Sequence, residues 1–135
     1  MTNIILTIPG EPKGKQRPRW HKVGTYTPKE TVDYETYIKE LFVIKYPDFE
    51  LLETALRLGL TAYLTIPKSK SQKKQALMES NDIKPTKNPD LDNILKIFLD
   101  ALEGLAYKND NQFVRIDAFK CYSSKPRLEI SIKEI

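Results

Sequence analysis

The chain is poor in the two side chains that disulfides and zinc sites require. Its 135 residues include one cysteine, Cys121, and one histidine, His21. A single cysteine excludes an intrachain disulfide, and one cysteine with one histidine cannot supply a Cys/His zinc cluster. If the protein binds a metal, oxygen ligands must therefore hold it.

Long hydrophobic runs are also missing. No apolar stretch approaches the roughly 20 residues that span a bilayer, and the N-terminal residues lack the basic segment of a secretory signal. The sequence has no glycine-rich phosphate loop and no internal repeat. With 30% charged residues and an ordinary apolar content, it indicates a soluble, cytoplasmic protein with a single domain over residues 1–135.

Positive charge is present, and it is concentrated in two segments. The net charge is only +4, but six cations and one acid lie between Glu11 and Lys29, and four lysines and no acid lie between 68 and 74. Such segments suit the phosphates of nucleic acid, although a solvated loop surface has the same composition. The candidate DNA-binding residues are Lys13, Lys15, Arg17, Arg19, Lys68, Lys70, Lys73 and Lys74.

The spacing of apolar residues predicts an α+β fold in which helices pack on one mixed β-sheet. Strands are expected at 4–8, 56–66, 113–123 and 126–135. Helices are expected at about 28–45, within 68–80 and at about 91–104. Thr27 and Ser71 are the expected N-caps of the first two helices. The last two strands are expected to pair as a hairpin, and a second, short hairpin to turn at Gly24.

Two aspartates, Asp90 and Asp92, stand one residue apart where the strongest helical pattern begins. In an extended dipeptide both carboxylates would point to one side and share a divalent cation, whereas in a regular helix they would diverge by about 200°. The sequence leaves open whether Asn88 or Asp92 is the N-cap of this helix. Acids in a first turn also have an ordinary structural role, because they satisfy free backbone N–H groups and the helix dipole.

Two further residues belong to this constellation. Lys96 follows Asp92 by four residues on the polar face of the helix, where it either pairs with Asp92 or Asp100 or meets a phosphate. Asp110 lies in a polar loop before a strand, a position at which an acid usually caps a turn. Spacing alone does not bring Asp110 near Asp90.

Two aromatic residues, Trp20 and Tyr26, flank the turn at Gly24. Aromatic side chains beside a hairpin more often pack on a helix than stack on bases. We therefore expect them to pack, with stacking on DNA as the alternative.

Three segments together resemble the RusA family of Holliday junction resolvases, small endonucleases that nick four-way DNA junctions. Residues 89–104, PDLDNILKIFLDALEG, are similar to the family's Asp-x-Asp-Asn, lysine and Asp-Ala-Leu helix. Residues 109–114, NDNQFV, are similar to its Asp-Asp-x-Gln-Val segment, and residues 9–20, PGEPKGKQRPRW, to its N-terminal Gly-x-Pro, lysine and Arg-Pro-Arg segment. All three occur in the family's order.

The resemblance implies a homodimer that cuts four-way junction DNA, with Asp90, Asp92 and Asp110 as metal ligands and, together with Lys96, as catalytic residues. The implied cofactor is Mg²⁺, with Mn²⁺ as a substitute. Carboxylate-bound Mg²⁺ would neutralise the phosphate and lower the pKa of a bound water, and Lys96 would offset developing charge.

The sequence departs from the family pattern at Asn109, where relatives carry an acid. Two alternatives to a junction endonuclease stay open, and the departure at Asn109 bears on the second of them. One is a metal-dependent nuclease for other branched or single-stranded DNA, and the other is a non-catalytic DNA-binding protein with a decayed site.

Overall fold

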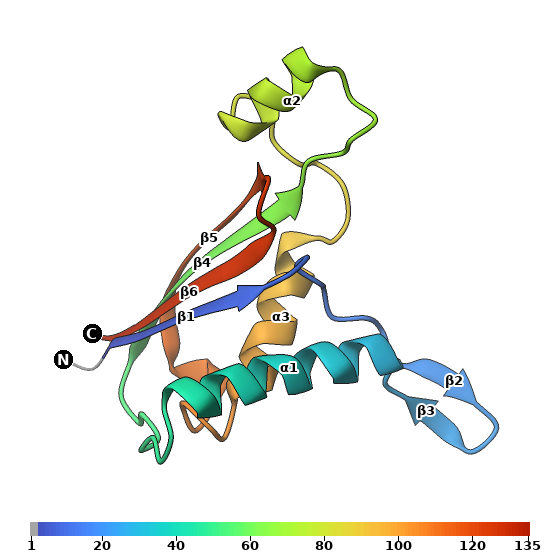
Figure 1. The fold of residues 1–135 in the computed structure, drawn as a ribbon. Helices are drawn as coiled ribbons and strands as arrows, with labels where there is room; N and C mark the ends of the chain where they lie inside the picture. The colour runs from blue at the N-terminus through green and yellow to red at the C-terminus, as the bar shows by residue number, and fades with distance from the viewer. Residues whose placement is uncertain (1–2) are drawn as a thin grey trace.

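A computed structural model describes residues 3–135, so residues 1 and 2 of the expected domain lie outside the described part. The α+β class is confirmed: three α-helices accompany a mixed four-stranded sheet and a small two-stranded sheet (Figure 1). Within the described residues, no helix is long and apolar enough to cross a membrane.

The elements match the expected positions to within a few residues. The strands are β1 (Asn3–Pro9), β2 (Arg19–His21), β3 (Gly24–Tyr26), β4 (Leu56–Thr65), β5 (Phe113–Ser123) and β6 (Arg127–Glu134). The helices are α1 (Lys29–Lys45), α2 (Gln72–Glu79) and α3 (Leu91–Leu102), and a 3₁₀ turn, η1 (Asp110–Gln112), precedes β5.

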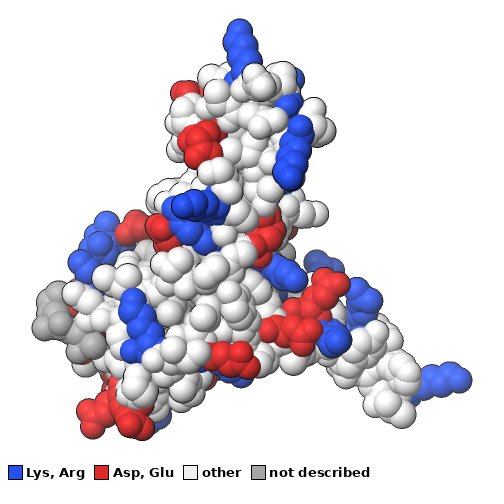
Figure 2. All heavy atoms as spheres, viewed as in Figure 1, with Lys and Arg blue, Asp and Glu red and all other residues white. Residues whose placement is uncertain are grey.

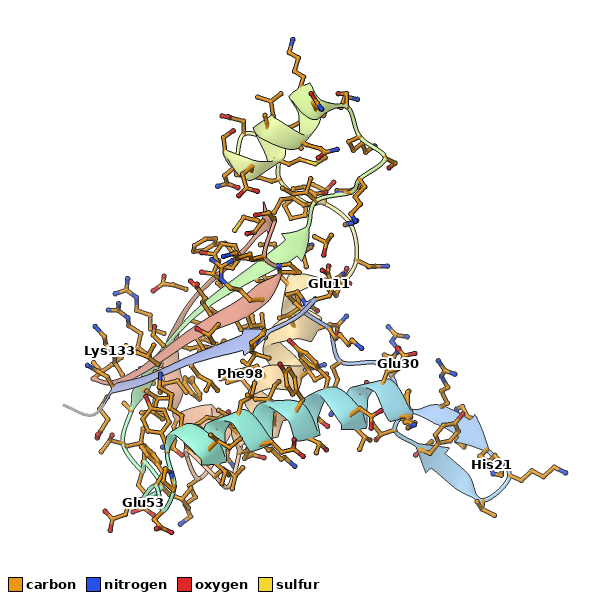
Figure 3. The ribbon with its side chains drawn as sticks, viewed as in Figure 1. Glu11, His21, Glu30, Glu53, Phe98 and Lys133 are labelled. Carbon is orange, nitrogen blue, oxygen red and sulfur yellow. The ribbon has the colours of Figure 1, made fainter. Side chains whose placement is uncertain are left out.

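The main sheet has the strand order β1-β6-β4-β5. Buried and more exposed side chains alternate along three of its strands, so that one side of the sheet faces the core. In β4 every second side chain from Leu56 to Leu64 is buried, and β1 and β6 alternate in the same way. α1 and α3 both cover this side, and Phe98 of α3 is fully buried in the shared core (Figure 3). The opposite side of the sheet is not covered by any helix of the described residues, so residues such as Phe119 are exposed there.

β5 and β6 do not form the hairpin that the sequence suggested. β4 lies between them, parallel to β5 and antiparallel to β6, so residues 124–126 connect strands that are not neighbours. The physical reason lies in β4, whose buried residues run its whole length. A central place in the sheet satisfies the backbone of such a strand on both sides, which an edge position does not.

The helix starts agree with the sequence at one of two expected caps. Ser71 caps α2, because its side chain accepts a hydrogen bond from the backbone N–H of Lys74 at 3.3 Å. Thr27 does not cap α1. The carbonyl of Pro28, whose ψ is 144°, accepts the first helical hydrogen bonds, from Thr31 and Val32, so Pro28 itself occupies the N-cap position.

Candidate active site

α3 begins at Leu91 with Asp90 at the N-cap position, so neither Asn88 nor Asp92 is the cap. Asp90 has an extended backbone (φ −68°, ψ 145°), yet its side chain accepts no capping hydrogen bond. Asp92 lies in the first turn of the helix. The ordinary structural role of an N-cap acid is therefore not fulfilled by Asp90, and its carboxylate is free to bind a ligand.

Asp90 and Asp92 line one surface pocket of about 490 Å³ at the start of α3, which we call the acidic pocket. Lys96 and Asp100 of α3 line it as well, because residues four apart lie on one face of a helix. The opposite wall is the segment of residues 15–18, which precedes β2. The structure thus brings together Asp90, Asp92 and Lys96, three of the four residues predicted to be catalytic.

Lys96 is exposed and forms no ion pair among the described residues. The pairs with Asp92 or Asp100 that its spacing allowed are not formed. Asp100 is engaged by Lys15 instead, so the ammonium of Lys96 remains available inside the acidic pocket.

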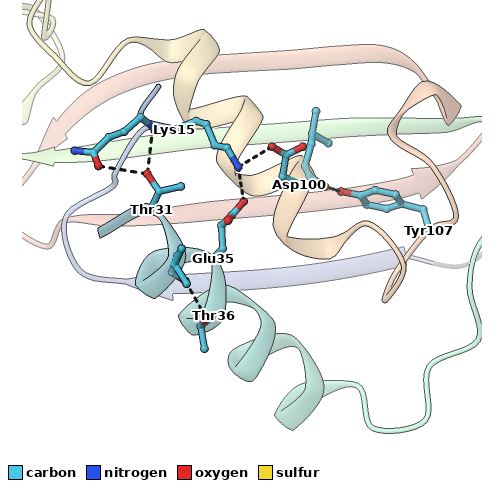
Figure 4. A network of polar contacts seen from close by, with 9 residues as sticks. Lys15, Thr31, Glu35, Thr36, Asp100 and Tyr107 are labelled. Atoms are coloured by element: carbon cyan, nitrogen blue, oxygen red, sulfur yellow. Dashed lines mark hydrogen bonds and ion pairs between the residues drawn. The ribbon is translucent and has the colours of Figure 1, made fainter. Parts of the chain in front are cut away.

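Lys15 is held between the two main helices (Figure 4). Its Nζ lies 3.0 Å from Oε2 of Glu35 in α1 and 3.1 Å from Oδ2 of Asp100 in α3. Partial burial alone opposes the charged ammonium, but the hydrogen bonds and charges of Glu35 and Asp100 outweigh it and raise the pKa of Lys15. Lys15 therefore neutralises part of the acidic pocket, and its assignment as a DNA contact stays a prediction.

Backbone contacts fix the segment before β2 against α3. The N–H of Lys15 donates to the carbonyl of Asn93 at 2.8 Å, and the N–H of Gln16 donates to Oγ1 of Thr31 at 3.2 Å. At Gly14 an added Cβ would lie 3.0 Å from Cβ of Asn93 and 3.2 Å from Cβ of Pro89, so a side chain at this position would force one of these neighbours to shift. These contacts hold Lys15 and Gln16, which line the acidic pocket, against α3 and α1.

Asp110 lies at the other end of α3. Its backbone N–H donates to Oε1 of Glu103, the residue that follows the helix, at 3.0 Å. The 12 residues of α3 span about 18 Å at the standard rise per residue. One chain therefore does not bring Asp110 to Asp90, and the described residues contain no group of three acidic, histidine or cysteine side chains placed to hold a metal.

Asn109, the departure from the family pattern, has a structural role. Its side-chain oxygen accepts a hydrogen bond from the N–H of Asn111 at 2.9 Å, and its own N–H donates to the side chain of Gln112 at 2.8 Å. This reciprocal capping box holds η1 and therefore fixes the position of Asp110.

The remaining predicted DNA contacts lie on two projecting elements, the β2–β3 hairpin and α2, and on the loops that precede them; we call each element with its loop a basic arm. Positively charged side chains extend from α2 and from the β2–β3 hairpin (Figure 2), and the N-terminal end of α3 lies between these two elements (Figure 1). The exposed cations are Lys13, Arg17, Arg19, Lys68, Lys70, Lys73 and Lys74. The basic segments therefore flank the acidic pocket.

The aromatic side chains of the β2–β3 hairpin, Trp20 and Tyr26, are more exposed than the sequence suggested. Trp20 is 85% exposed and Tyr26 is 48% exposed, because the hairpin extends beyond the start of α1 into solvent (Figure 1). The expectation that both pack on a helix is wrong for Trp20.

The donor set of the acidic pocket fits a hard divalent cation. Asp90 and Asp92 supply carboxylate oxygens, and Mg²⁺ is commonly held by one or two carboxylates together with waters and substrate phosphates. The nitrogen and sulfur ligands that zinc favours are absent here, since the only histidine lies in β2 and the only cysteine in β5. Asp90 and Asp92 are the residues of this pocket that could hold such an ion.

Sequence reasoning missed two contributions to the site. It gave Asp100 no role except as a partner of Lys96, although Asp100 shares the helical face of Asp92 and lines the acidic pocket. It also treated Lys15 as one cation among six. Helical spacing was a signal for Asp100, but nothing local to residue 15 indicates a partner 85 positions away in the chain.

The chain is similar to known proteins over nearly its whole length. The chain is similar to the uncharacterized protein YqaN of Bacillus subtilis (strain 168), with 33% identity over 141 aligned residues that cover all of this chain and 99% of that protein. Residues 9–133 match the family model of endodeoxyribonuclease RusA, and this range includes the acidic pocket, η1 and the segment before β2. The resemblance seen in the three sequence segments is confirmed, and the chain belongs to the RusA family of endodeoxyribonucleases.

Proposed function

We propose that the protein is a Mg²⁺-dependent endonuclease of the cytoplasm that nicks Holliday junctions symmetrically and so resolves recombination intermediates. One observation carries the proposal: Asp90 stands at a helix N-cap without capping, and its free carboxylate shares a pocket with Asp92 and Lys96. In a chain of an endodeoxyribonuclease family, such a pocket is suited to phosphodiester hydrolysis.

Each pocket residue has a distinct role in this chemistry. Asp90 and Asp92 bind Mg²⁺, which when bound neutralises phosphate oxygens and lowers the pKa of a coordinated water. Lys96 places an unpaired ammonium one helical turn from Asp92, where it stabilises negative charge that develops on the phosphate or the leaving oxygen. Lys15 holds Asp100 and Glu35, and so keeps those carboxylates from repelling the substrate.

The two basic arms bind DNA. Carboxylates that face a phosphate backbone repel it, and cations on either side must compensate. Lys13, Arg17 and Arg19 on one side and the lysines of residues 68–74 on the other are exposed and flank the acidic pocket. Replacing Arg17 and Arg19 by alanine should weaken binding and reduce its salt dependence, and an unchanged salt slope would exclude them from the interface.

Asp110 and symmetry support a homodimer. A four-way junction requires two matched cuts, which a two-fold dimer provides with two sites. Asp110 is exposed, and its carboxylate forms no hydrogen bond or ion pair among the described residues. In a pair whose α3 helices run antiparallel, Asp110 of each copy approaches the acidic pocket of the other and joins Asp90 and Asp92 as a third metal-binding carboxylate.

The activity test uses a synthetic four-way junction, a flap and a linear duplex, each with and without Mg²⁺. The junction should be nicked fastest, and Asp92→Asn should abolish nicking while preserving binding. The matched control is Glu53→Gln, which removes an exposed carboxylate at the far end of α1 (Figure 3). Equal rates on all three substrates would favour a general nuclease, and the absence of Mg²⁺ or Mn²⁺ binding would favour a non-catalytic DNA-binding protein.

The dimer test mixes two inactive variants, Asp90→Asn and Asp110→Asn. If Asp110 acts on the partner's pocket, each mixed dimer contains one intact site and one doubly altered site, so nicking of one strand returns. If Asp110 acts within its own chain, both sites of the mixed dimer are defective and nicking does not return.

A further inference from the structure

The β2–β3 hairpin is an arm whose surface is unusual for a two-stranded element in water. Trp20 and Val23 are 85% and 92% exposed, although small hairpins gain stability mainly by burying such side chains. The register pairs Arg19 with Tyr26 and His21 with Gly24, so these residues share one face. Trp20 and its partner Thr25 are on the other face, where Trp20 has no ring contact among the described residues.

The arm continues directly from the wall of the acidic pocket. Arg17 and Pro18 line that pocket, and β2 begins with the next residue. Trp20 is three residues beyond Arg17, which in an extended chain is roughly 10 Å. Successive nucleotides of one strand are about 3.4 Å apart along the helix axis. A DNA strand with a phosphate near the pocket would therefore bring a base about three nucleotides away to Trp20.

We propose that Trp20 stacks on bases exposed at the branch point of the bound DNA, so that the arm selects junctions over intact duplex. This inference rests on the proposed function and names the group that would recognise the branch. The interior of a linear duplex offers no exposed base face, whereas a branch point offers unstacked bases. Stacking of an aromatic ring on a base depends little on sequence, which suits recognition of structure.

The positive charge of the β2–β3 hairpin favours DNA, rather than a second copy of the chain, as the partner that covers Trp20. Arg17, Arg19 and Lys22 lie within three residues of Trp20 in the sequence and form no ion pair among the described residues. Two such arms, or an arm and the basic α2 of another copy, would repel each other. A phosphate backbone on either side of an exposed base neutralises the same cations.

The position of Trp20 allows a direct measurement, because it is the only tryptophan of the chain. Its selectively excited fluorescence is followed while the protein is titrated with an immobile four-way junction, a single strand and a blunt duplex, with chelator present to prevent cleavage. The junction and the single strand should quench the emission and the duplex should not. An unchanged emission when the junction is bound would overturn the proposal, as would a change with protein concentration alone, which would indicate a contact between copies.

Variants of Trp20 separate stacking from charge. Trp20→Ala should lower junction affinity roughly ten-fold and leave duplex affinity nearly unchanged, whereas Trp20→Phe, which keeps a ring, should retain most of the junction affinity. Ile44→Ala, which removes a side chain 77% exposed near the end of α1, is the control and should change neither affinity. Equal losses on junction and duplex would overturn the proposal.

The test of stacking by Trp20 can succeed or fail independently of the proposed nuclease activity. Binding and quenching are measured without divalent ions, so a protein that quenches on junctions but never nicks them refutes the nuclease and keeps the arm. A protein that nicks junctions without quenching or a Trp20→Ala defect refutes the role of the arm alone.

Discussion

Replacing Lys15 by methionine should destabilise the fold and make the acidic pocket more negative. Methionine keeps most of the apolar stem and removes only the ammonium that joins Glu35 of α1 to Asp100 of α3. Glu35 and Asp100 then carry two negative charges with no cation between them. The change therefore tests whether Lys15 holds the two helices together across the site.

The expected loss follows from the exposure of the three side chains. Lys15, Glu35 and Asp100 are 26%, 17% and 40% exposed, so the two ion pairs are neither fully screened nor buried. Exposed pairs contribute about 0.2–1 kcal/mol each, and partly buried, hydrogen-bonded ones somewhat more, which gives a total of about 1–2 kcal/mol. For a chain of this size the melting temperature should fall by roughly 3–8 °C.

The assay is a double-mutant cycle in urea with Lys15→Met, Glu35→Gln and their combination. A coupling free energy of about 0.5 kcal/mol or more is expected, and a coupling near zero would refute the bridge. The pH dependence gives an independent check. Because the folded-state pKa of Lys15 is raised, its contribution is complete below the ordinary lysine value of 10.5 and is lost as the pH rises through the folded-state pKa.

Three further predictions follow from single contacts. Gly14→Ala should slow junction cleavage about ten-fold or more in a single-turnover assay, since the new Cβ would lie 3.0 Å from Cβ of Asn93 and displace the pocket wall. In urea unfolding, Tyr107→Phe should cost about 1–2 kcal/mol because its hydroxyl donates to the carbonyl of Leu99 at 2.6 Å. Tyr34→Phe should cost less, because the buried Tyr34 hydroxyl meets only the backbone of Lys13 and forms no hydrogen bond of normal geometry among the described residues. Burial raises the pKa of both phenols above the ordinary value of 10.0, so the folded state keeps protons that the unfolded state loses, and stability measured by thermal melting should fall as the pH rises above that value.

Much of the fold was predictable because its elements have strong local periods. The buried residues of α3, such as Ile94 and Phe98, recur at helical spacing, and β4 alternates over its whole length. The pairing of β5 and β6 was not predictable in this way. Their short connection favours a hairpin locally, and only the burial of β4, far away in the sequence, places that strand between them.

The start of α3 shows why the site was only partly predictable. The sequence pattern suggested Asn88 or Asp92 as the cap, whereas the cap is Asp90. All three residue types cap helices well, so intrinsic preference does not distinguish these positions. In the structure, the N–H of Lys15 donates to the carbonyl of Asn93 and packs a distant segment against the first turn. Such a contact between segments nearly 80 residues apart has no local signal.

The charge balance of the acidic pocket connects metal binding to DNA binding in the proposed function. Three carboxylates (Asp90, Asp92 and Asp100) and three cations (Lys15, Arg17 and Lys96) line it, so its formal charge is zero. A bound divalent ion changes this charge to about +2 and makes the pocket attractive to phosphate, and by reciprocity bound DNA strengthens metal binding. Mg²⁺ should therefore increase junction affinity. The measurement uses Lys96→Ala, which slows cleavage and whose pocket changes from a formal charge of −1 to +1 when the ion binds. Asp92→Asn, whose pocket is positive without the ion, should bind junctions more tightly in chelator and respond little to Mg²⁺. An equal Mg²⁺ response in both proteins would show that the ion acts on the DNA alone and not through this pocket.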